Sequence, residues 1–224
     1  MLAYVRGPMV WIALIVFVSG SAYQILRLFL LSRKAGPVVG RVPASPGANR
    51  ARNRPIVDRL TRIRNRIGLT VFGTYPITAT VSTVFHVSIF LTPLFLLGHN
   101  VLIELSLGVS LPSFPEAVSD GLTLVVILCC AFFLARRMVV PKVRVISSFS
   151  DYLVLGLAGV PFLSGFLAYH QIYDYQTVML VHMISGELML IAIPFTKLTH
   201  MTFFFFNRFL VVNEHTLGSG KRIW

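Results

Sequence analysis

The sequence predicts an all-α membrane protein with five transmembrane helices, and three observations lead to this fold class. The 224-residue chain is 55% apolar and only 12% charged, whereas soluble domains are about a quarter charged. Five apolar segments are each long enough to cross a bilayer, which takes about 20 helical residues. Nearly all basic residues lie between these segments, which is the topology signal of membrane proteins. This distribution argues against nucleic-acid binding as the reason for the net charge of +12.

The five predicted spans cover approximately residues 9–31, 71–107, 121–140, 152–170 and 177–206. The second and fifth spans exceed the minimum length and each contains a proline, Pro93 and Pro194, which are candidate positions for a kink. The only two cysteines, Cys129 and Cys130, are adjacent in the apolar third span. We interpret them as packing residues, so a cysteine-ligated iron–sulfur cluster is not expected in this chain.

The distribution of Lys and Arg over the loops predicts the orientation of the spans. The segments 33–66, 136–144 and 208–222 contain basic residues, whereas the loops around 104–120 and 170–176 contain none. The positive-inside rule then predicts a periplasmic N-terminus and a cytoplasmic C-terminus. In the first span most positive charges follow the apolar run, which favours a retained anchor over a cleaved signal peptide.

The long basic segment at 33–67 has two parts. Residues 35–52 are rich in Pro, Gly, Ala and Arg and are predicted to form a cytoplasmic linker. In residues 54–67, Ile56, Leu60, Ile63 and Ile67 fall on one helical face with arginines elsewhere, which predicts a basic amphipathic helix. Its two interpretations are binding to membrane lipids and docking of a cytoplasmic partner. Residues 1–224 are otherwise interpreted as a single membrane domain.

Four of the six histidines lie inside predicted spans, His86 and His99 in the second and His182 and His200 in the fifth. Ionisable residues inside a membrane are costly and suggest function. Because the two spans run in opposite directions, His99 shares a depth with His182, and His86 shares one with His200. Two imidazoles at one depth can ligate a haem iron from both faces, which favours electron transfer over oxygen binding. We therefore predict two haems, although one buried histidine alone is more often a hydrogen-bonded packing residue.

The spacing of the histidines requires a distortion of the second span. The pair in the fifth span is 18 residues apart, which is five turns and about 27 Å on a straight helix. The pair in the second span is 13 residues apart, which is about 20 Å and about 140° around the helix. The mismatch of about 7 Å requires a bend at Pro93, a tilt, or unwinding near Gly98.

Three further charged residues have candidate roles. Glu187, inside the fifth span, is a candidate proton or quinone site, with a neutral helix contact as the alternative. Lys197 and Arg208 are candidate partners of haem propionates, with anchoring at the cytoplasmic face as the alternative. His170 and His215 are interpreted as surface residues. No catalytic residue is predicted.

Five helices, an outside N-terminus and histidine pairs on the second and fifth helices resemble the gamma subunit of respiratory nitrate reductase. Related membrane cytochromes occur in the transmembrane redox complexes of sulfate-reducing bacteria. The resemblance implies two haem b in a multi-pass protein of the bacterial inner membrane. It implies that His99 and His182 hold a distal, periplasmic-side haem. His86 and His200 would then hold a proximal haem that faces a cytoplasmic iron–sulfur subunit.

The resemblance leaves two candidate electron donors. In the nitrate reductase family a periplasmic-side lysine contributes to the quinol site, whereas here no Lys or Arg occurs between Arg66 and Arg136. The expected donor is therefore either the quinone pool, with menaquinone as the candidate cofactor, or a periplasmic multihaem cytochrome c. The alternatives from other classes are a small proton-coupled transporter and a haem-free membrane anchor subunit. No reaction beyond quinol oxidation is expected of the chain itself.

Overall fold

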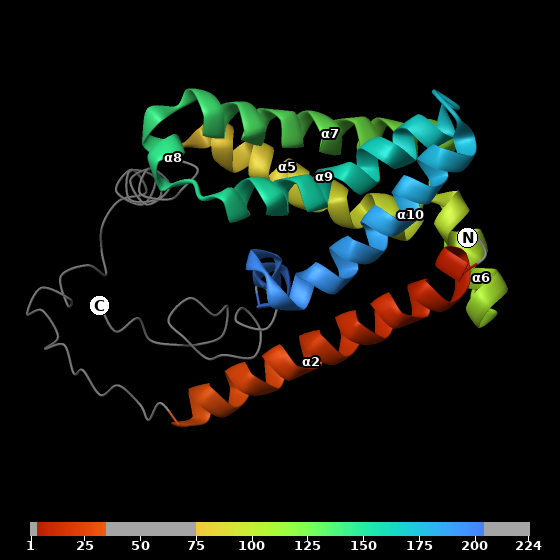
Figure 1. Ribbon diagram of the computed structural model, residues 1–224, viewed down its shortest axis with the longest axis horizontal. Coiled ribbons are helices and arrows are strands. Elements are labelled where there is room, and N and C mark those ends of the chain that lie inside the picture. The colour runs from red at the N-terminus through yellow and green to blue at the C-terminus, as the bar shows by residue number, and fades with distance from the viewer. Residues whose placement is uncertain (1–3, 35–74, 204–224) are drawn as a thin grey trace, which may run out of the picture. The chain divides into compact units, whose positions relative to one another are not determined.

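The computed structural model describes residues 4–34 and 75–203, and the regular elements in these ranges are all helical (Figure 1). Five of the helices are long and apolar enough to cross a membrane, which confirms the predicted multi-pass fold. The predicted linker and amphipathic helix lie outside the described residues after Lys34. In chain order the elements are η1 (Val5–Met9), α2 (Val10–Lys34), α5 (Pro76–Phe95), α6 (Leu97–Leu107), α7 (Glu116–Val139), α8 (Pro141–Ile146), α9 (Phe149–Tyr169), α10 (Tyr175–Ala192), η3 (Ile193–Phe195) and η4 (Lys197–Thr199).

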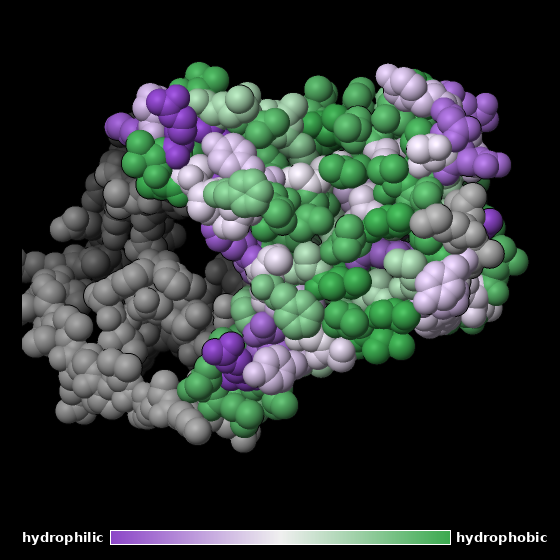
Figure 2. All heavy atoms as spheres, viewed as in Figure 1, coloured by the Kyte–Doolittle hydropathy of each residue, from purple (hydrophilic) through white to green (hydrophobic). Residues whose placement is uncertain are grey.

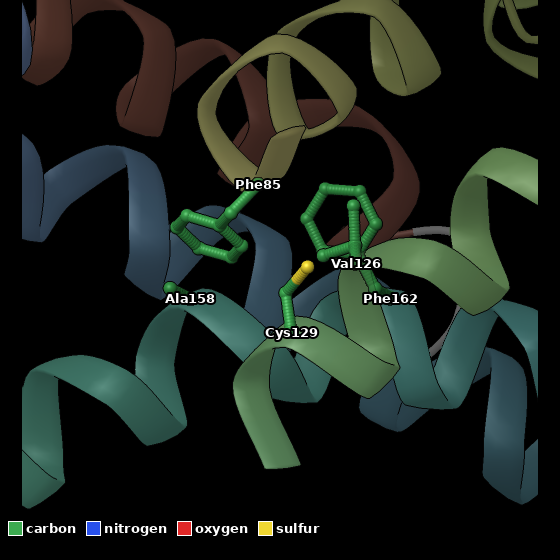
Figure 3. Packing of buried hydrophobic residues seen from close by; sticks show 5 residues of the cluster. All are labelled: Phe85, Val126, Cys129, Ala158 and Phe162. Atoms are coloured by element: carbon green, nitrogen blue, oxygen red, sulfur yellow. The ribbon is translucent and has the colours of Figure 1, made fainter. Parts of the chain in front are cut away.

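The chain divides into two compact units, residues 1–54 with 183–224, and residues 55–182. In the second unit α7 packs against both α5 and α9. Figure 3 shows the apolar side chains that hold these three helices together, which are Phe85 from α5, Val126 and Cys129 from α7, and Ala158 and Phe162 from α9. Cys129 is a buried free thiol in this cluster, which confirms its interpretation as a packing residue.

Apolar side chains cover the outer faces of the helices. Figure 2 shows mainly hydrophobic residues along the visible helices, with hydrophilic residues gathered near their ends. No more than 28% of the most apolar window of any candidate span is buried. In water this exposure would favour aggregation, whereas hydrocarbon solvates such surfaces and leaves the helical backbone bonds intact.

The predicted second span is divided into α5 and α6, and the division falls at Leu96, between Pro93 and Gly98, the two candidate positions for a distortion. Leu96 has an extended backbone with φ −74° and ψ 126°. In a continuous helix the Phe95 carbonyl would accept from the amide of His99. Here the Phe95 carbonyl instead accepts from the amide of Phe114 at 2.9 Å, and the His99 amide donates to the Leu96 carbonyl at 3.1 Å. A bond from a distant loop therefore replaces one helical bond at the division.

The loop before α7 holds this division in place. The rings of Phe95 and Phe114 lie 4.8 Å apart between centroids. The buried Asn100 donates from Nδ2 to the Pro112 carbonyl at 3.0 Å and to the Ser113 hydroxyl at 2.9 Å. The backbone around His99 is thus fixed by contacts with residues more than ten positions away.

The fifth span is also interrupted, because α10 ends at Ala192 and is followed by the 3₁₀ turns η3 and η4. Between these turns Thr196 is extended, with φ −120° and ψ −173°. The expectation that His182 and His200 lie five turns apart on one regular helix is therefore wrong. Proline lacks the amide hydrogen that a helix needs, and Pro194 lies within η3. The Thr199 hydroxyl donates to the Ile193 and Thr196 carbonyls instead.

The end of the fifth span is attached to the first helix within the same unit. Gln24 of α2 donates from Nε2 to the Pro194 carbonyl at 2.8 Å. A Cβ atom at Gly20 would lie only 2.8 Å from the Pro194 ring. A larger residue at position 20 would therefore separate the two segments. These contacts stabilise the interrupted conformation that precedes His200.

Asp174 caps the start of α10, the helix that carries His182. Its Oδ2 accepts from the amide and the hydroxyl of Thr177 at 2.9 and 2.6 Å. These two hydrogen bonds lower the pKa of Asp174 below the ordinary carboxyl value, because they stabilise the ionised form.

Asp174 is expected to make the first turn of α10 sensitive to acid. A lowered pKa means that the stabilisation is present above the ordinary carboxyl pKa and is lost as the pH falls through the lowered value. The protection of the amides of residues 177–180 against hydrogen exchange, relative to their intrinsic rates at the same pH, should therefore fall in acid. Asp174→Asn, which keeps a capping oxygen, should remove this pH dependence, whereas Asp174→Ala should accelerate exchange at every pH. An unchanged acid dependence in Asp174→Asn would contradict the assignment.

Candidate functional site

His99 of α6 and His182 of α10 lie side by side within the unit of residues 55–182. Their ring centroids are 6.0 Å apart and the ring planes are inclined by only 20°. Both side chains are partly buried. These two residues are 83 positions apart in the sequence, and the folding of this unit brings them together.

Each ring of this pair is oriented by a backbone carbonyl of a proline. His99 donates from Nδ1 to the Pro93 carbonyl at 3.0 Å, and His182 donates from Nδ1 to the Pro161 carbonyl at 2.9 Å. A carbonyl oxygen can only accept, so the proton of each neutral ring is assigned to Nδ1 and the lone pair to Nε2. Histidines that bind metals adopt this arrangement, in which the second ring nitrogen donates to a carbonyl or carboxylate.

The other two predicted ligands have the same hydrogen bond. His86 donates from Nδ1 to the Ser82 carbonyl at 2.6 Å, and His200 donates from Nδ1 to the Lys197 carbonyl at 2.6 Å. His170 differs, because its Nε2 faces the Asp120 carboxylate at 3.0 Å. The four candidate ligands therefore share a tautomer with the lone pair on Nε2, whereas the histidine interpreted as a surface residue is engaged through Nε2.

A glycine on α9 makes room for His182. A Cβ atom at Gly165 would lie 3.0 Å from Cε1 and 3.1 Å from Nδ1 of the His182 ring. Gly165 follows Pro161 by four residues, so both lie on the face of α9 that meets this ring. Our sequence analysis missed Gly165, Pro161 and Asn100. The Pro–Gly pair at helical spacing was a signal for the first two, whereas no local pattern marked Asn100.

The donor set of this pair fits a haem better than a metal ion held by protein alone. Within residues 4–34 and 75–203 no group of three or more His, Cys, Asp or Glu side chains converges on one point. A protein-only metal site needs three or four such ligands, whereas a porphyrin supplies four nitrogens and leaves two axial positions for the protein. The ring centroids of His99 and His182 are 6.0 Å apart in a stacked arrangement, and each Nδ1 is engaged by a backbone carbonyl, so Nε2 is the nitrogen on each ring that would hold such a group.

The remaining candidate residues have different outcomes. Glu187 lies on α10 and is buried, and Lys197 is exposed at the start of η4. Arg208 lies outside the described residues. The pairing of His86 with His200 stays a prediction, since His86 belongs to one unit and His200 to the other.

The fold defines the chain as a multi-pass helical membrane protein, and the site adds a pair of carbonyl-oriented histidines. The chain belongs to the same family as a protein of Nitratidesulfovibrio vulgaris strain Hildenborough, to which it is 36% identical. The similarity covers 98% of this chain and 96% of the relative, whose name, "Protein", states no function. No family model matches the chain. No solved structure matches it either.

Proposed function

We propose that the chain is a dihaem b-type cytochrome subunit of a respiratory complex in a bacterial inner membrane. The observation that carries this proposal is the shared orientation of four histidines, each with Nδ1 hydrogen-bonded to a backbone carbonyl. One pair of these rings, His99 and His182, also lies within one site, with ring centroids 6.0 Å apart. A packing role would not require the same tautomer at all four positions.

His99 and His182 would hold one haem, and His86 and His200 the other. Lys197 and Arg208 would pair with propionates of the second haem. A bound haem b supplies the exchange of one electron between ferric and ferrous iron. A haem held by two imidazoles would have no open coordination site, so these residues would favour electron transfer over oxygen chemistry. The Pro93 and Pro161 carbonyls would continue to accept hydrogen bonds from Nδ1 of His99 and His182 in both oxidation states.

The distribution of basic residues supports one orientation of the chain in the membrane. A periplasmic N-terminus and cytoplasmic C-terminus follow from the positive-inside rule. The His99–His182 pair would then lie on the periplasmic side, near a donor that is either menaquinol or a multihaem cytochrome c. The His86–His200 pair would lie on the cytoplasmic side, near an iron–sulfur subunit. The basic segments between spans would contact membrane lipids and this partner.

The proposal is tested by the reduced-minus-oxidised absorbance spectrum of the purified protein and by its haem content. We expect a b-type α-band and about two haems per chain, one for each histidine pair. A proton-coupled transporter would show no band but would acidify or alkalinise liposomes under a proton gradient. An anchor subunit would show neither signal. An absent band would therefore overturn the proposal.

The donor is tested separately on the haem-loaded protein. Reduction by a menaquinol analogue but not by a reduced periplasmic cytochrome c would assign the quinone pool as the donor. The opposite result would assign the cytochrome. The control is a variant without the His99–His182 site, which should slow reduction by either periplasmic-side donor.

A further inference from the structure

Glu187 is a buried acid with no hydrogen-bond partner. Its side chain is only 5% exposed, and neither Oε1 nor Oε2 has a partner among the described residues. It lies on α10, five residues before the helix ends at Ala192, within a candidate membrane span. Burial of an ionised carboxylate without a partner is strongly unfavourable, whereas the protonated acid is tolerated. The site therefore favours a carboxyl group whose proton is gained or lost in response to a nearby charge.

Structural explanations for Glu187 require a partner, and the described part of the chain provides none. A structural ion pair needs a basic group within about 4 Å, and none of the described residues provides one. The described titratable groups of the same unit are Tyr4, Arg6, Tyr23 and Arg27 on the N-terminal helix, and Lys197 and His200 after α10. None of these groups forms a hydrogen bond or an ion pair with Glu187.

The position of Glu187 places it close to a candidate haem ligand. Glu187 follows His182 by five residues on the same continuous helix, which is a rise of about 7.5 Å and a rotation of about 140° around the axis. The two side chains therefore leave different faces of the helix, less than two turns apart, and are not adjacent in sequence. Charges at such a separation still interact in a low-dielectric membrane interior. A change of charge at the His99–His182 site would therefore alter the protonation of Glu187.

We propose that Glu187 is a proton-binding site coupled to electron transfer, an inference that rests on the proposed function. As one electron arrives from a quinol or a reduced cytochrome, the Glu187 carboxylate takes up one proton and becomes the neutral acid. On loss of the electron the acid releases the proton. Charge is balanced in each direction, because one electron enters with one proton. The positive charge of the ferric site favours the carboxylate, and its loss on reduction favours the acid.

The test is a redox titration of the haem-loaded protein at several pH values, with wild type, Glu187→Gln and the matched control Glu104→Gln. Glu104 is an exposed carboxylate on α6. With one proton per electron, the ratio of reduced to oxidised haem at a fixed potential falls by up to about tenfold per pH unit. We expect a dependence of this kind in wild type and Glu104→Gln, and a clearly weaker one in Glu187→Gln. Haem propionates are common to all three proteins and cancel in the comparison.

Infrared difference spectra provide a second readout. Reduction should produce a carbonyl band of a protonated carboxylic acid in wild type and Glu104→Gln, and this band should be absent in Glu187→Gln. If Glu187→Gln loses haem, Glu187→Asp retains the acid and should retain a shifted band. A wild type without the band would overturn the inference.

The two proposals fail in different ways. Full haem content with an unchanged pH dependence in Glu187→Gln would overturn the role of Glu187 and leave the cytochrome proposal intact. A wild-type protein without haem would overturn the proposed function, and the role of Glu187 with it.

Discussion

Replacing either His99 or His182 by alanine is expected to remove about half of the haem from the purified protein. The physical reason is that in the proposed function both imidazoles hold the same haem, so the loss of either residue would disable the same site. The double variant should therefore lose no more haem than each single variant. Haem content per chain, measured after extraction, gives the result directly. His170→Ala is the matched control and should retain all the haem, because its Nε2 is engaged by Asp120.

A double variant that removes one histidine from each proposed pair should lose more haem than either single variant. His86→Ala combined with His99→Ala should lose nearly all haem, since the ligands of one haem site act together whereas the effects of separate haem sites add. If the His99→Ala, His182→Ala double variant lost all haem, the pairing would be wrong. Equal haem loss in His170→Ala would show that a different histidine serves as a ligand.

Adding one methyl group at Gly165 is expected to disrupt the His99–His182 site without unfolding the protein. The new Cβ would lie 3.0 Å from the His182 ring, which is closer than ordinary van der Waals contact. The ring must then shift and weaken its bond to the Pro161 carbonyl. A typical hydrogen bond contributes about 0.5–1.5 kcal/mol, so haem affinity at this site should fall several-fold or more. Titration of the unloaded protein with haem measures this affinity.

Two glycines on the same helix serve as controls for this substitution. A Cβ at Gly156 would meet no atom within 4 Å, and one at Gly159 would meet only Cys130. Gly156→Ala should retain full haem and slightly raise stability, because alanine favours a helix by about 0.5–1 kcal/mol. Gly159→Ala distinguishes general crowding of α9 from contact with the histidine. Normal haem binding by Gly165→Ala would show that this glycine does not position His182.

The sequence was sufficient to predict that there are five spans, because hydrocarbon selects for long apolar segments whatever their packing. The predicted second and fifth spans, 71–107 and 177–206, were too long, since the candidate spans of the structure are Pro76–Phe95 and Tyr175–Phe195. The sequence also predicted that His99 needs a distorted helix. It did not locate that distortion at Leu96, because the bond that replaces the helical one comes from Phe114, in a distant loop. The same reason explains why Asn100 was missed, since its partners are Pro112 and Ser113.

In the fifth span the position of a possible kink was predicted, but its effect on the histidine spacing was not considered. Pro194 was a candidate for a kink, but the spacing of His182 and His200 was calculated on a straight helix. The chain instead forms 3₁₀ turns around an extended Thr196, supported by Gln24 of the first helix. Contacts of this kind depend on tertiary neighbours, and periodicity along one segment does not contain them. The four histidines were chosen from their depth in the predicted spans 71–107 and 177–206. The candidate spans of the structure end at Phe95 and Phe195, so His99 and His200 follow them, and the role of the four histidines as haem ligands stays a prediction.

The contact between His99 and His182 also has a consequence for biosynthesis. His182 is translated 83 residues after His99, which takes about 4–17 s at typical rates of chain elongation. During that interval the second, third and fourth spans are already made while one side of the site is missing. The haem of the proposed function could therefore be captured between both rings only after the fifth span has entered the membrane. Under that proposal loading is a late step of maturation, and a chain truncated before α10 would have no complete site in which to retain the cofactor.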